Sequence, residues 1–359
     1  MHGLTRRDLA LAAAAAGLTA TAFPAFADDR QPAIIAEGGA AEERIVDTRG
    51  AFELAIQQGA DFLQATLVAT KEGALVARRS AELSETTDVA TRPEFAGRRA
   101  TKTIAGQSVD GWFAEDFTLA EIVTLFAREP EPAAHPQSLR LSGKEPVLSL
   151  PDVLQIARDG CVRTGRTIGA CLRLAHPARY TGLGLDVVGR LADELNAEGY
   201  VAPAAAVWVQ GYEADALRAF GRLSHVRRML MIDAGDADTP ARTTTAGLGD
   251  IKAYAEAIGP DQALLIDPTA ATFPAPTTLA LDAHNAGLGV FAHTVRAQNA
   301  ALPPALRRGG NPNGRGDVGK LLVALFADRV DGVATDLPGE ASRARGQVMD
   351  ALRRAQSRS

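Results

Sequence analysis

The sequence predicts an α/β protein whose parallel strands close into a (β/α)8 TIM barrel. Two observations predict this fold: short apolar runs alternate with amphipathic helical segments, and about eight such units follow one another without an internal repeat. An open, doubly wound sheet is the competing architecture, because the same alternation produces it. The 46% of hydrophobic residues are enough for one large core.

The first 27 residues have the features of a signal peptide. Arg6 and Arg7 precede an alanine-rich apolar stretch, and Ala25-Phe26-Ala27 is a small-x-small cleavage site. The paired arginines favour the twin-arginine export route, so we expect a mature periplasmic protein that forms one domain over residues 28–359. An uncleaved anchor is the alternative, although the apolar run is shorter than the roughly 20 residues that span a bilayer.

Each predicted strand is a short run rich in apolar residues. The runs are 33–36, 61–68, 74–78, 167–174, 204–210, 228–233, 263–267, 288–295 and 330–336. Between them, Leu183, Val187, Leu191 and Leu195 recur at helical spacing, and Thr118-Leu119-Ala120-Glu121 is a capping box that begins another helix. Residues that end barrel strands gather at one face, so a site is expected there.

Three segments show neither pattern and are predicted to be loops: 79–116, 129–147 and 298–316. The last is rich in glycine and contains Arg307, Arg308 and Arg315. It is either a mobile lid with cationic tips that closes over an anionic ligand, or an ordinary solvated surface loop.

Charge and cysteine content restrict the partners. Without residues 1–27 the chain has 36 basic and 42 acidic residues, a net charge near −6, which disfavours nucleic acid. No segment of the mature chain is long and apolar enough to be a membrane helix.

Cys161 and Cys171 either form a disulfide or stay buried as free thiols, and with so few histidines nearby they do not predict a zinc site.

Short strings along nearly the whole chain are similar to landmarks of the periplasmic glycerophosphodiester phosphodiesterases, in that family's order. Ile34-Ile35-Ala36 followed by Gly39-Ala40 resembles the family's opening strand and H-R-G-A, and residues 59–63 resemble the start of G-A-D-x-(L/I)-E-x-D. The other strings are at 87–90, 116–119, 209–212, 293–296 and 332–338. Seven strings in order indicate descent from that family, which implies the same barrel.

The chain departs from the family at the residues that carry out the chemistry. The resemblance implies two histidines as general acid and base, and three carboxylates that hold calcium or magnesium against the phosphodiester. The histidine positions are occupied by Glu37 and Arg79, the metal-ligand positions by Gln64, Thr66 and Cys171, and a lysine position by Arg173. Val46 stands where the family has a further carboxylate, although the adjoining Thr48 is kept.

These replacements predict a site without a metal ion or other cofactor. A hard divalent cation prefers several anionic oxygens, whereas Gln64, Thr66 and Cys171 offer two neutral oxygens and a soft sulfur. Arg79 stays protonated at any working pH, so it cannot replace the histidine as an acid or base. We therefore expect that the family's route to hydrolysis is lost.

The strand ends predict an anion-binding site instead. Arg79 and Arg173 can hold the phosphate or carboxylate of a small ligand, such as a glycerophosphodiester-like molecule. The expected ligand-binding residues are Glu37, Gln64, Thr66, Arg79, Cys171, Arg173 and Gln210. The alternative is that Glu37 and Arg79 neutralise each other as a structural ion pair.

Two histidines lie near the predicted strand ends. His293 is the strand-end histidine that could still act as a general acid or base, and a packed, hydrogen-bonded histidine is the alternative. His176 follows the strand of Cys171 and Arg173, and we expect it to begin a loop.

Three functions are consistent with these residues. The first is a catalytically degenerate family member that binds a small anion. The second is an active phosphoric diester hydrolase with a rearranged site, which requires Glu37, His293 and one of Glu42, Glu43 or Asp47 to converge on one pocket. The third is a structural or interaction protein of the envelope, whose barrel mouth would be filled by side chains.

Overall fold

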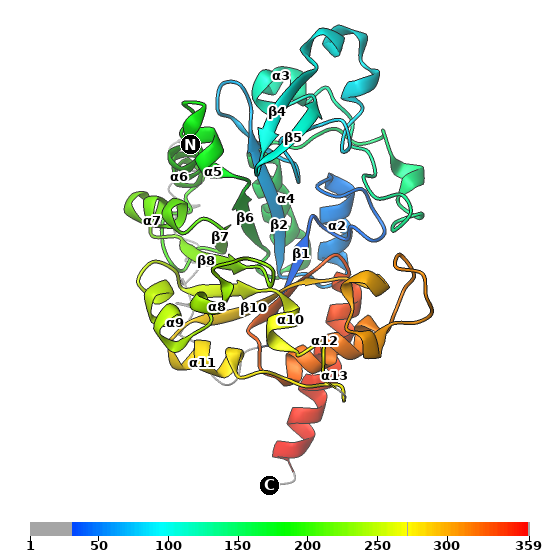
Figure 1. Ribbon diagram of the computed structural model, residues 1–359, viewed down its shortest axis with the longest axis vertical. Helices are drawn as coiled ribbons and strands as arrows, with labels where there is room; N and C mark the ends of the chain where they lie inside the picture. The colour runs from blue at the N-terminus through cyan, green and yellow to red at the C-terminus, as the bar shows by residue number, and fades with distance from the viewer. Residues whose placement is uncertain (1–30, 271, 358–359) are drawn as a thin grey trace, which may run out of the picture.

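The computed structural model describes residues 31–270 and 272–357, in which eight parallel strands close into a barrel (Figure 1). The strands are β1 (Ala33–Glu37), β2 (Phe62–Ala69), β6 (Gly169–Leu174), β7 (Val207–Gly211), β8 (Arg227–Ile232), β9 (Ala257–Pro260), β10 (Gly289–Val295) and β11 (Gly332–Thr335). Since β1 pairs with β11 on one side and with β2 on the other, the predicted TIM barrel is confirmed and the open sheet is excluded. The predicted signal peptide lies outside the described residues.

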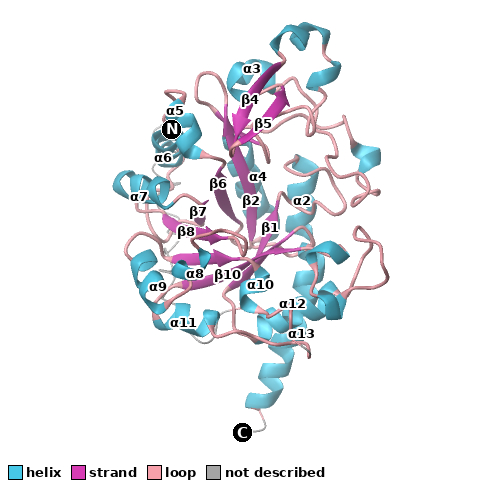
Figure 2. Ribbon diagram, in the orientation of Figure 1, coloured by secondary structure: helices cyan, strands magenta, loops and turns pink. Residues whose placement is uncertain are grey.

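Helices surround the strands, as Figure 2 shows. The main helices after successive strands are α2 (Arg49–Gln57), α4 (Leu150–Thr164), α6 (Val187–Ala197), α7 (Ala214–Leu223), α9 (Thr245–Lys252), α11 (Leu279–Asn285), α12 (Val318–Ala327) and α13 (Pro338–Gln356). Shorter helices are α3 (Leu119–Ile122), α5 (Pro177–Gly182), α8 (Thr239–Arg242) and α10 (Gln262–Leu265). None of the helices in the described ranges is long and apolar enough to cross a bilayer.

One predicted strand is wrong. Residues 263–267 belong largely to helix α10, and the strand is β9, which has the sequence Ala-Ile-Gly-Pro. Glycine and proline are poor strand formers, so the local sequence does not identify β9. Pairing with β8 and β10 on its two sides holds this segment in the barrel.

A long insertion separates β2 from α4. It begins with β3 (Leu75–Ala77), which pairs antiparallel with the end of β2, and contains a hairpin of β4 (Ala100–Ile104) and β5 (Gln107–Gly111). The hairpin corrects the prediction that residues 79–116 form only loop. Its two-residue turn at Ala105 and Gly106 has positive φ at both positions, the geometry that matches the twist of paired strands. The capping box at Thr118 is confirmed at the start of α3.

Residues through which the chain resembles the family have structural roles. Gly39 has φ +91°, and a Cβ atom there would lie 2.5 Å from the backbone of Ala51, so only glycine fits. The hydroxyl of Thr48 caps α2 by accepting from the Ala51 amide at 3.3 Å. The Asp61 carboxylate accepts from the backbone amide of Ile34 at 2.9 Å. These contacts hold the barrel and its first helix together whether or not the site hydrolyses anything.

The barrel interior is apolar below its mouth, the end at which the strands finish. An inner cluster consists of Ile35, Cys171, Trp208, Met229, Met231, Ala257, Phe291 and Ala334. Side chains alternate along a strand, so the residue two positions further on points inward one layer higher. Glu37 stands above Ile35 and Arg173 above Cys171 in this way, which places polar side chains on an apolar floor.

Candidate functional site

Glu37, Thr66 and Arg173 meet at the centre of the mouth. Strand register brings them together, because Thr66 of β2 lies beside Arg173 of β6, and Glu37 of β1 lies beside Gln64 of β2. The Arg173 guanidinium donates to the Thr66 hydroxyl from Nε at 3.2 Å and from Nη2 at 2.9 Å, and Nη2 is 3.3 Å from Glu37 Oε1. Gln64 also donates to Thr66 Oγ1, at 3.2 Å.

A β-bulge in β10 brings a further group to this centre. The pairing of β10 with β11 shifts register between Ala292 and Val295, so both intervening side chains are redirected. The Thr294 hydroxyl donates to Glu37 Oε2, while His293 lies 3.2 Å from Asp233 and 3.2 Å from the Tyr212 hydroxyl. His293 is therefore a packed, hydrogen-bonded histidine at the mouth, and it pairs with a carboxylate.

Glu37 is ionised in this setting. Burial alone would raise its pKa, but the guanidinium groups of Arg173 and Arg296 and the Thr294 hydroxyl outweigh burial and lower the pKa to about 2. An acid held this strongly in its carboxylate form cannot donate a proton near neutral pH, and it is a weak base.

The alternative ion pair between Glu37 and Arg79 is wrong. Arg79 follows the antiparallel strand β3, and its guanidinium binds Glu131 of the insertion at 2.7 Å. Arg296 approaches the same carboxylate at 3.8 Å. Glu37 instead pairs with Arg173 of β6, whose side chain points into the barrel.

A narrow cavity opens above this centre. Its lining residues are Glu37, Gly38, Ala41, Val46, Asp47, Gln64, Thr66, Arg79, Glu129, Pro130, His135, Arg173, Arg296 and Asp336. The cavity leaves about 20 Å³ for the centres of water molecules, which is room for one or two waters. Three arginines and several carboxylates thus share a small space at the mouth.

Two residues predicted to bind ligand lie outside the cavity. Cys171 is fully buried in the inner apolar cluster, where burial raises its thiol pKa. Gln210 is buried as well, and its amide nitrogen is 3.6 Å from the Met229 sulfur. Both corrections have the same cause, because the two side chains point into the barrel one layer below Arg173 and Tyr212. Gln64, Thr66, Arg79, Arg173 and Glu37 do line the cavity.

The positions that the resemblance assigns to metal ligands do not suit a hard cation here. Cys171 lies below the mouth among apolar side chains, and the Thr66 oxygen already accepts from Arg173 and Gln64. The guanidinium of Arg173 therefore supplies the positive charge between Glu37 and Thr66. Calcium or magnesium would need anionic oxygens at these positions, and the side chains present do not provide them.

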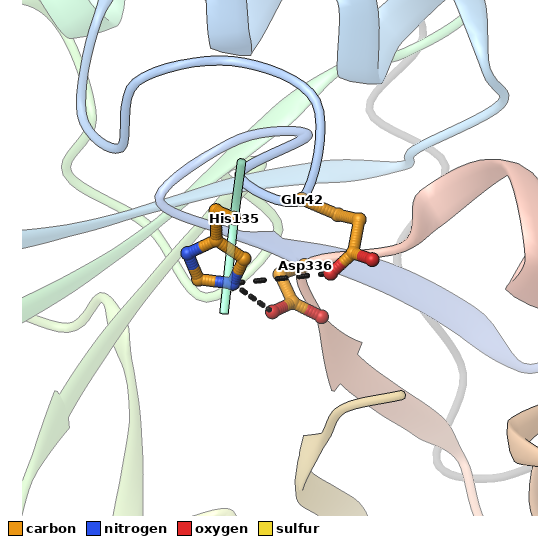
Figure 3. A group of neighbouring side chains, drawn as sticks. All are labelled: Glu42, His135 and Asp336. Carbon is orange, nitrogen blue, oxygen red and sulfur yellow. Dashed lines mark ion pairs between the residues drawn. The ribbon is translucent and has the colours of Figure 1, made fainter. Parts of the chain in front are cut away.

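Sequence reasoning missed a second polar group at the cavity wall. His135 of the insertion faces Glu42 of the β1–α2 loop and Asp336 after β11, with Nε2 3.8 and 3.9 Å from their carboxylate oxygens (Figure 3). The three ligand atoms lie within 4.8 Å of one another. Only the unusual histidine in a proline-rich segment, 129–147, could have drawn attention to it.

The segment predicted to be either a lid or a surface loop has its arginines already bound. Arg308 pairs with Asp317, and Arg315 binds Glu42 at 2.8 Å and also Glu340. Arg307 donates to the Leu302 carbonyl at 2.9 Å. These contacts fit an ordered loop at the rim of the mouth better than a lid with free cationic tips.

Two smaller predictions are also settled. Both cysteines are free thiols, so the disulfide is excluded. His176 adopts φ +48° immediately before α5, and it therefore begins a short helix where a loop was expected.

Replacing Asp47 by asparagine is expected to stabilise the protein most at neutral pH. Burial raises the pKa of Asp47 from 3.8 to about 6, although Arg78 and Arg79 oppose it. Ionisation of Asp47 therefore destabilises the folded protein increasingly as the pH rises from 3.8 to about 6. Asparagine cannot ionise and tolerates the φ of +57° at this position. Urea unfolding should find the variant more stable by about 2–3 kcal/mol at neutral pH and nearly unchanged near pH 4. A difference independent of pH would contradict the raised pKa.

Comparisons with known proteins agree on one family. The sequence profile of the glycerophosphoryl diester phosphodiesterase family matches residues 39–340. A glycerophosphodiester phosphodiesterase of Arabidopsis thaliana, GDPD6, is 27% identical over 291 residues, which cover 76% of each chain.

Solved structures share the fold. A glycerophosphodiester phosphodiesterase from Agrobacterium tumefaciens has a TM-score of 0.56 at 16% identity, covering 87% of this chain and 99% of that one. A phosphodiesterase from Oleispira antarctica, in complex with the product sn-glycerol-3-phosphate, has a TM-score of 0.57 at 17% identity, covering 88% and 96%.

Proposed function

Because the chain belongs to the glycerophosphoryl diester phosphodiesterase family, we propose that it binds a small phosphate ester at the barrel mouth and does not hydrolyse it by the family's metal-dependent route. The observation that carries this proposal is the position of Arg173. Its guanidinium lies between Glu37 and Thr66, two of the positions that the resemblance assigns to acid–base and metal chemistry. A fixed cation supports anion binding there without a metal ion.

The cavity offers further donors for an anion. Arg173 uses Nε and Nη2 in its contacts, and Nη1 makes no hydrogen bond within the described part of the chain. Arg79 and Arg296 line the same cavity and share the carboxylate of Glu131. Guanidinium groups bind phosphate oxygens through pairs of parallel N–H donors, so three of them around one cavity favour a phosphate group.

A ligand enters when the outer ion pair moves. The cavity itself holds only one or two waters, but the side chains of Arg79 and Glu131 are 32% and 41% exposed. A pair this exposed contributes about 0–1 kcal/mol, so it separates at little cost. Its separation frees Arg79 and widens the mouth beside Arg173.

Calorimetric titration with sn-glycerol 3-phosphate tests the proposal. We expect one site per chain, no binding of glycerol, and binding at least about 10-fold weaker in Arg173→Lys, which keeps the charge but loses the planar pair of donors. Arg228→Lys is the matched control, because Arg228 binds Glu256 at 2.7 Å near the amino end of β8, away from the mouth. An equal loss of affinity in both variants, or no binding at millimolar sn-glycerol 3-phosphate, would contradict the proposal.

A second candidate function is hydrolysis by a rearranged site. The observation in its favour is the contact of His293 with Asp233 at 3.2 Å, since a histidine paired with a carboxylate can act as a general base. The relatives named above are phosphodiesterases by name, which points the same way. The turnover measurement described in the Discussion decides between the two.

A further inference from the structure

We propose that Glu42, His135 and Asp336 form a binding site for a divalent transition metal ion such as Zn²⁺, displaced from the positions that ligate metal in the family. The three residues come from distant parts of the sequence and point toward one another, as Figure 3 shows. We call them the carboxylate–histidine cluster. The inference rests on the geometry of this cluster and is independent of the proposed anion binding.

The spacing of the cluster is close to that of a metal site. His135 Nε2 lies 3.8 Å from Glu42 Oε2 and 3.9 Å from Asp336 Oδ2. Ligand atoms about 2.1 Å from zinc are separated by about 3.4 Å in a tetrahedron, so the two distances from His135 exceed this spacing by about half an ångström or less. The three ligand atoms all lie within 4.8 Å of one another. One imidazole nitrogen with two carboxylates favours a transition metal over calcium or magnesium, which prefer oxygen alone.

Neighbouring groups orient the histidine as metal-binding histidines are oriented. The other ring nitrogen of His135, Nδ1, lies 3.2 Å from the buried carboxylate of Glu129. A proton on Nδ1 directed at Glu129 leaves the lone pair of Nε2 facing Glu42 and Asp336. Glu129 is itself fixed by the Ser138 hydroxyl, which donates to its Oε2. Glu129, His135 and the proposed metal position thus follow the carboxylate–histidine–metal order of metal sites.

Two buried oxygens at the cluster have no hydrogen-bond partner in the described residues. Asp336 is 4% exposed, and in the described residues its Oδ1 has no hydrogen-bond partner. Gln298 is 8% exposed, and its amide nitrogen lies 3.1 Å from Glu42 Oε2 and 3.3 Å from His135 Nε2. The Gln298 amide oxygen also lacks a partner in the described chain. Exchanging the positions of the amide nitrogen and oxygen, by rotation of the Gln298 side-chain amide, would present that oxygen to the cluster as a fourth ligand.

The charge around the cluster suits a cation. Glu42, Glu129 and Asp336 supply three carboxylates. Arg315 binds the outer oxygen of Glu42 at 2.8 Å, which leaves Oε2 for the cluster. Arg296 also lies near the cluster, but its guanidinium pairs with the Glu131 carboxylate at 3.8 Å. A bound dication would be held by these side chains and would join the β1–α2 loop, the insertion and the end of β11.

Zinc titration of chelator-treated protein in phosphate-free buffer tests the inference. We expect one Zn²⁺ per chain, a rise in melting temperature on binding, and at least about 100-fold weaker binding in Glu42→Gln and in Asp336→Asn. Glu129→Gln should weaken binding about 10- to 100-fold without changing the stoichiometry, because Glu129 only orients His135. The visible spectrum of bound Co²⁺ should show low-coordinate nitrogen and oxygen ligation and should be lost in Glu42→Gln.

His284→Gln is the matched control, because His284 binds Asp331 at 2.8 Å at the opposite end of the barrel strands. Its zinc affinity should equal that of the unchanged protein. Glu42 is partly exposed, so Glu42→Gln is expected to fold even if a change at buried His135 does not. No zinc binding at micromolar concentration, or binding that survives both Glu42→Gln and Asp336→Asn, would overturn the site and leave a hydrogen-bonded cluster only. Neither outcome depends on whether glycerol 3-phosphate binds.

Discussion

The purified protein is expected to release no glycerol 3-phosphate from glycerophosphocholine or glycerophosphoethanolamine above the uncatalysed background. The same result is expected with calcium, magnesium, zinc or a chelator. General acid–base groups contribute about 10²- to 10⁴-fold each, and a metal adds several kcal/mol of charge stabilisation. The replacement of both histidines and of the metal carboxylates, which the resemblance implies, should therefore lower the rate by at least about a millionfold relative to an active family member.

Variants identify the chemistry if turnover does occur. Loss of activity in His293→Gln would make the contact with Asp233 catalytic and would favour the second candidate function. Loss in Glu37→Gln would make Glu37 the base despite its low pKa. Zinc-dependent activity that disappears in Glu42→Gln would assign hydrolysis to the carboxylate–histidine cluster. Each of these results would contradict binding without turnover and would favour hydrolysis by a rearranged site. An active glycerophosphodiester phosphodiesterase run in parallel validates the assay.

Replacing Glu37 by alanine is expected to lower the free energy of unfolding by about 3 kcal/mol. The change leaves Arg173 unpaired at a site where only 16% of its side chain is exposed, and it removes the acceptor of Thr294. Breaking a buried ion pair by removing one partner typically costs about 3–5 kcal/mol. Urea unfolding measures the effect. Glu53→Ala is the control. Glu53 is 38% exposed and pairs with Arg49 at 3.7 Å on the surface of a helix, and such a pair contributes about 0.5 kcal/mol or less.

The pH dependence of Glu37→Gln separates charge from packing. The pKa of Glu37 in the folded protein is lowered from 4.5 to about 2, so its ionic contribution is present above about pH 4.5 and is lost as the pH falls through about 2. The stability difference between the original protein and Glu37→Gln should therefore shrink on acidification. A constant difference down to pH 2 would show that the glutamate contributes through its hydrogen bonds alone.

Much of the fold was predictable because it depends on patterns that repeat along the chain. Alternating strand and helix units predicted the barrel, and the structure confirms eight parallel strands. The exception was β9, where glycine and proline hide the strand and only the neighbouring strands hold it. The sequence did not predict the hairpin of β4 and β5, because it is not one of the repeating strand–helix units. One short turn at Ala105 and Gly106 specifies it.

The sequence by itself determined the family and the residue types at the strand ends. The resemblance assigns Glu37, Arg79, Gln64 and Thr66 to positions of the family's histidines and carboxylates, and all four line the cavity. Spacing along the chain could not determine which charges meet. Glu37 pairs with Arg173 because strand register aligns β1, β2 and β6, whereas Arg79 leaves on β3 toward Glu131.

Only the tertiary structure could bring Glu42, His135 and Asp336 together. They lie on three segments that are far apart in sequence, and one of these segments is irregular and has no periodic pattern to interpret. Local pattern fixes the direction of a side chain relative to its own strand or helix. The contacts between elements depend on barrel closure, the β10 bulge and the path of the insertion, so the charge pairs and the cluster were decided by packing over long range.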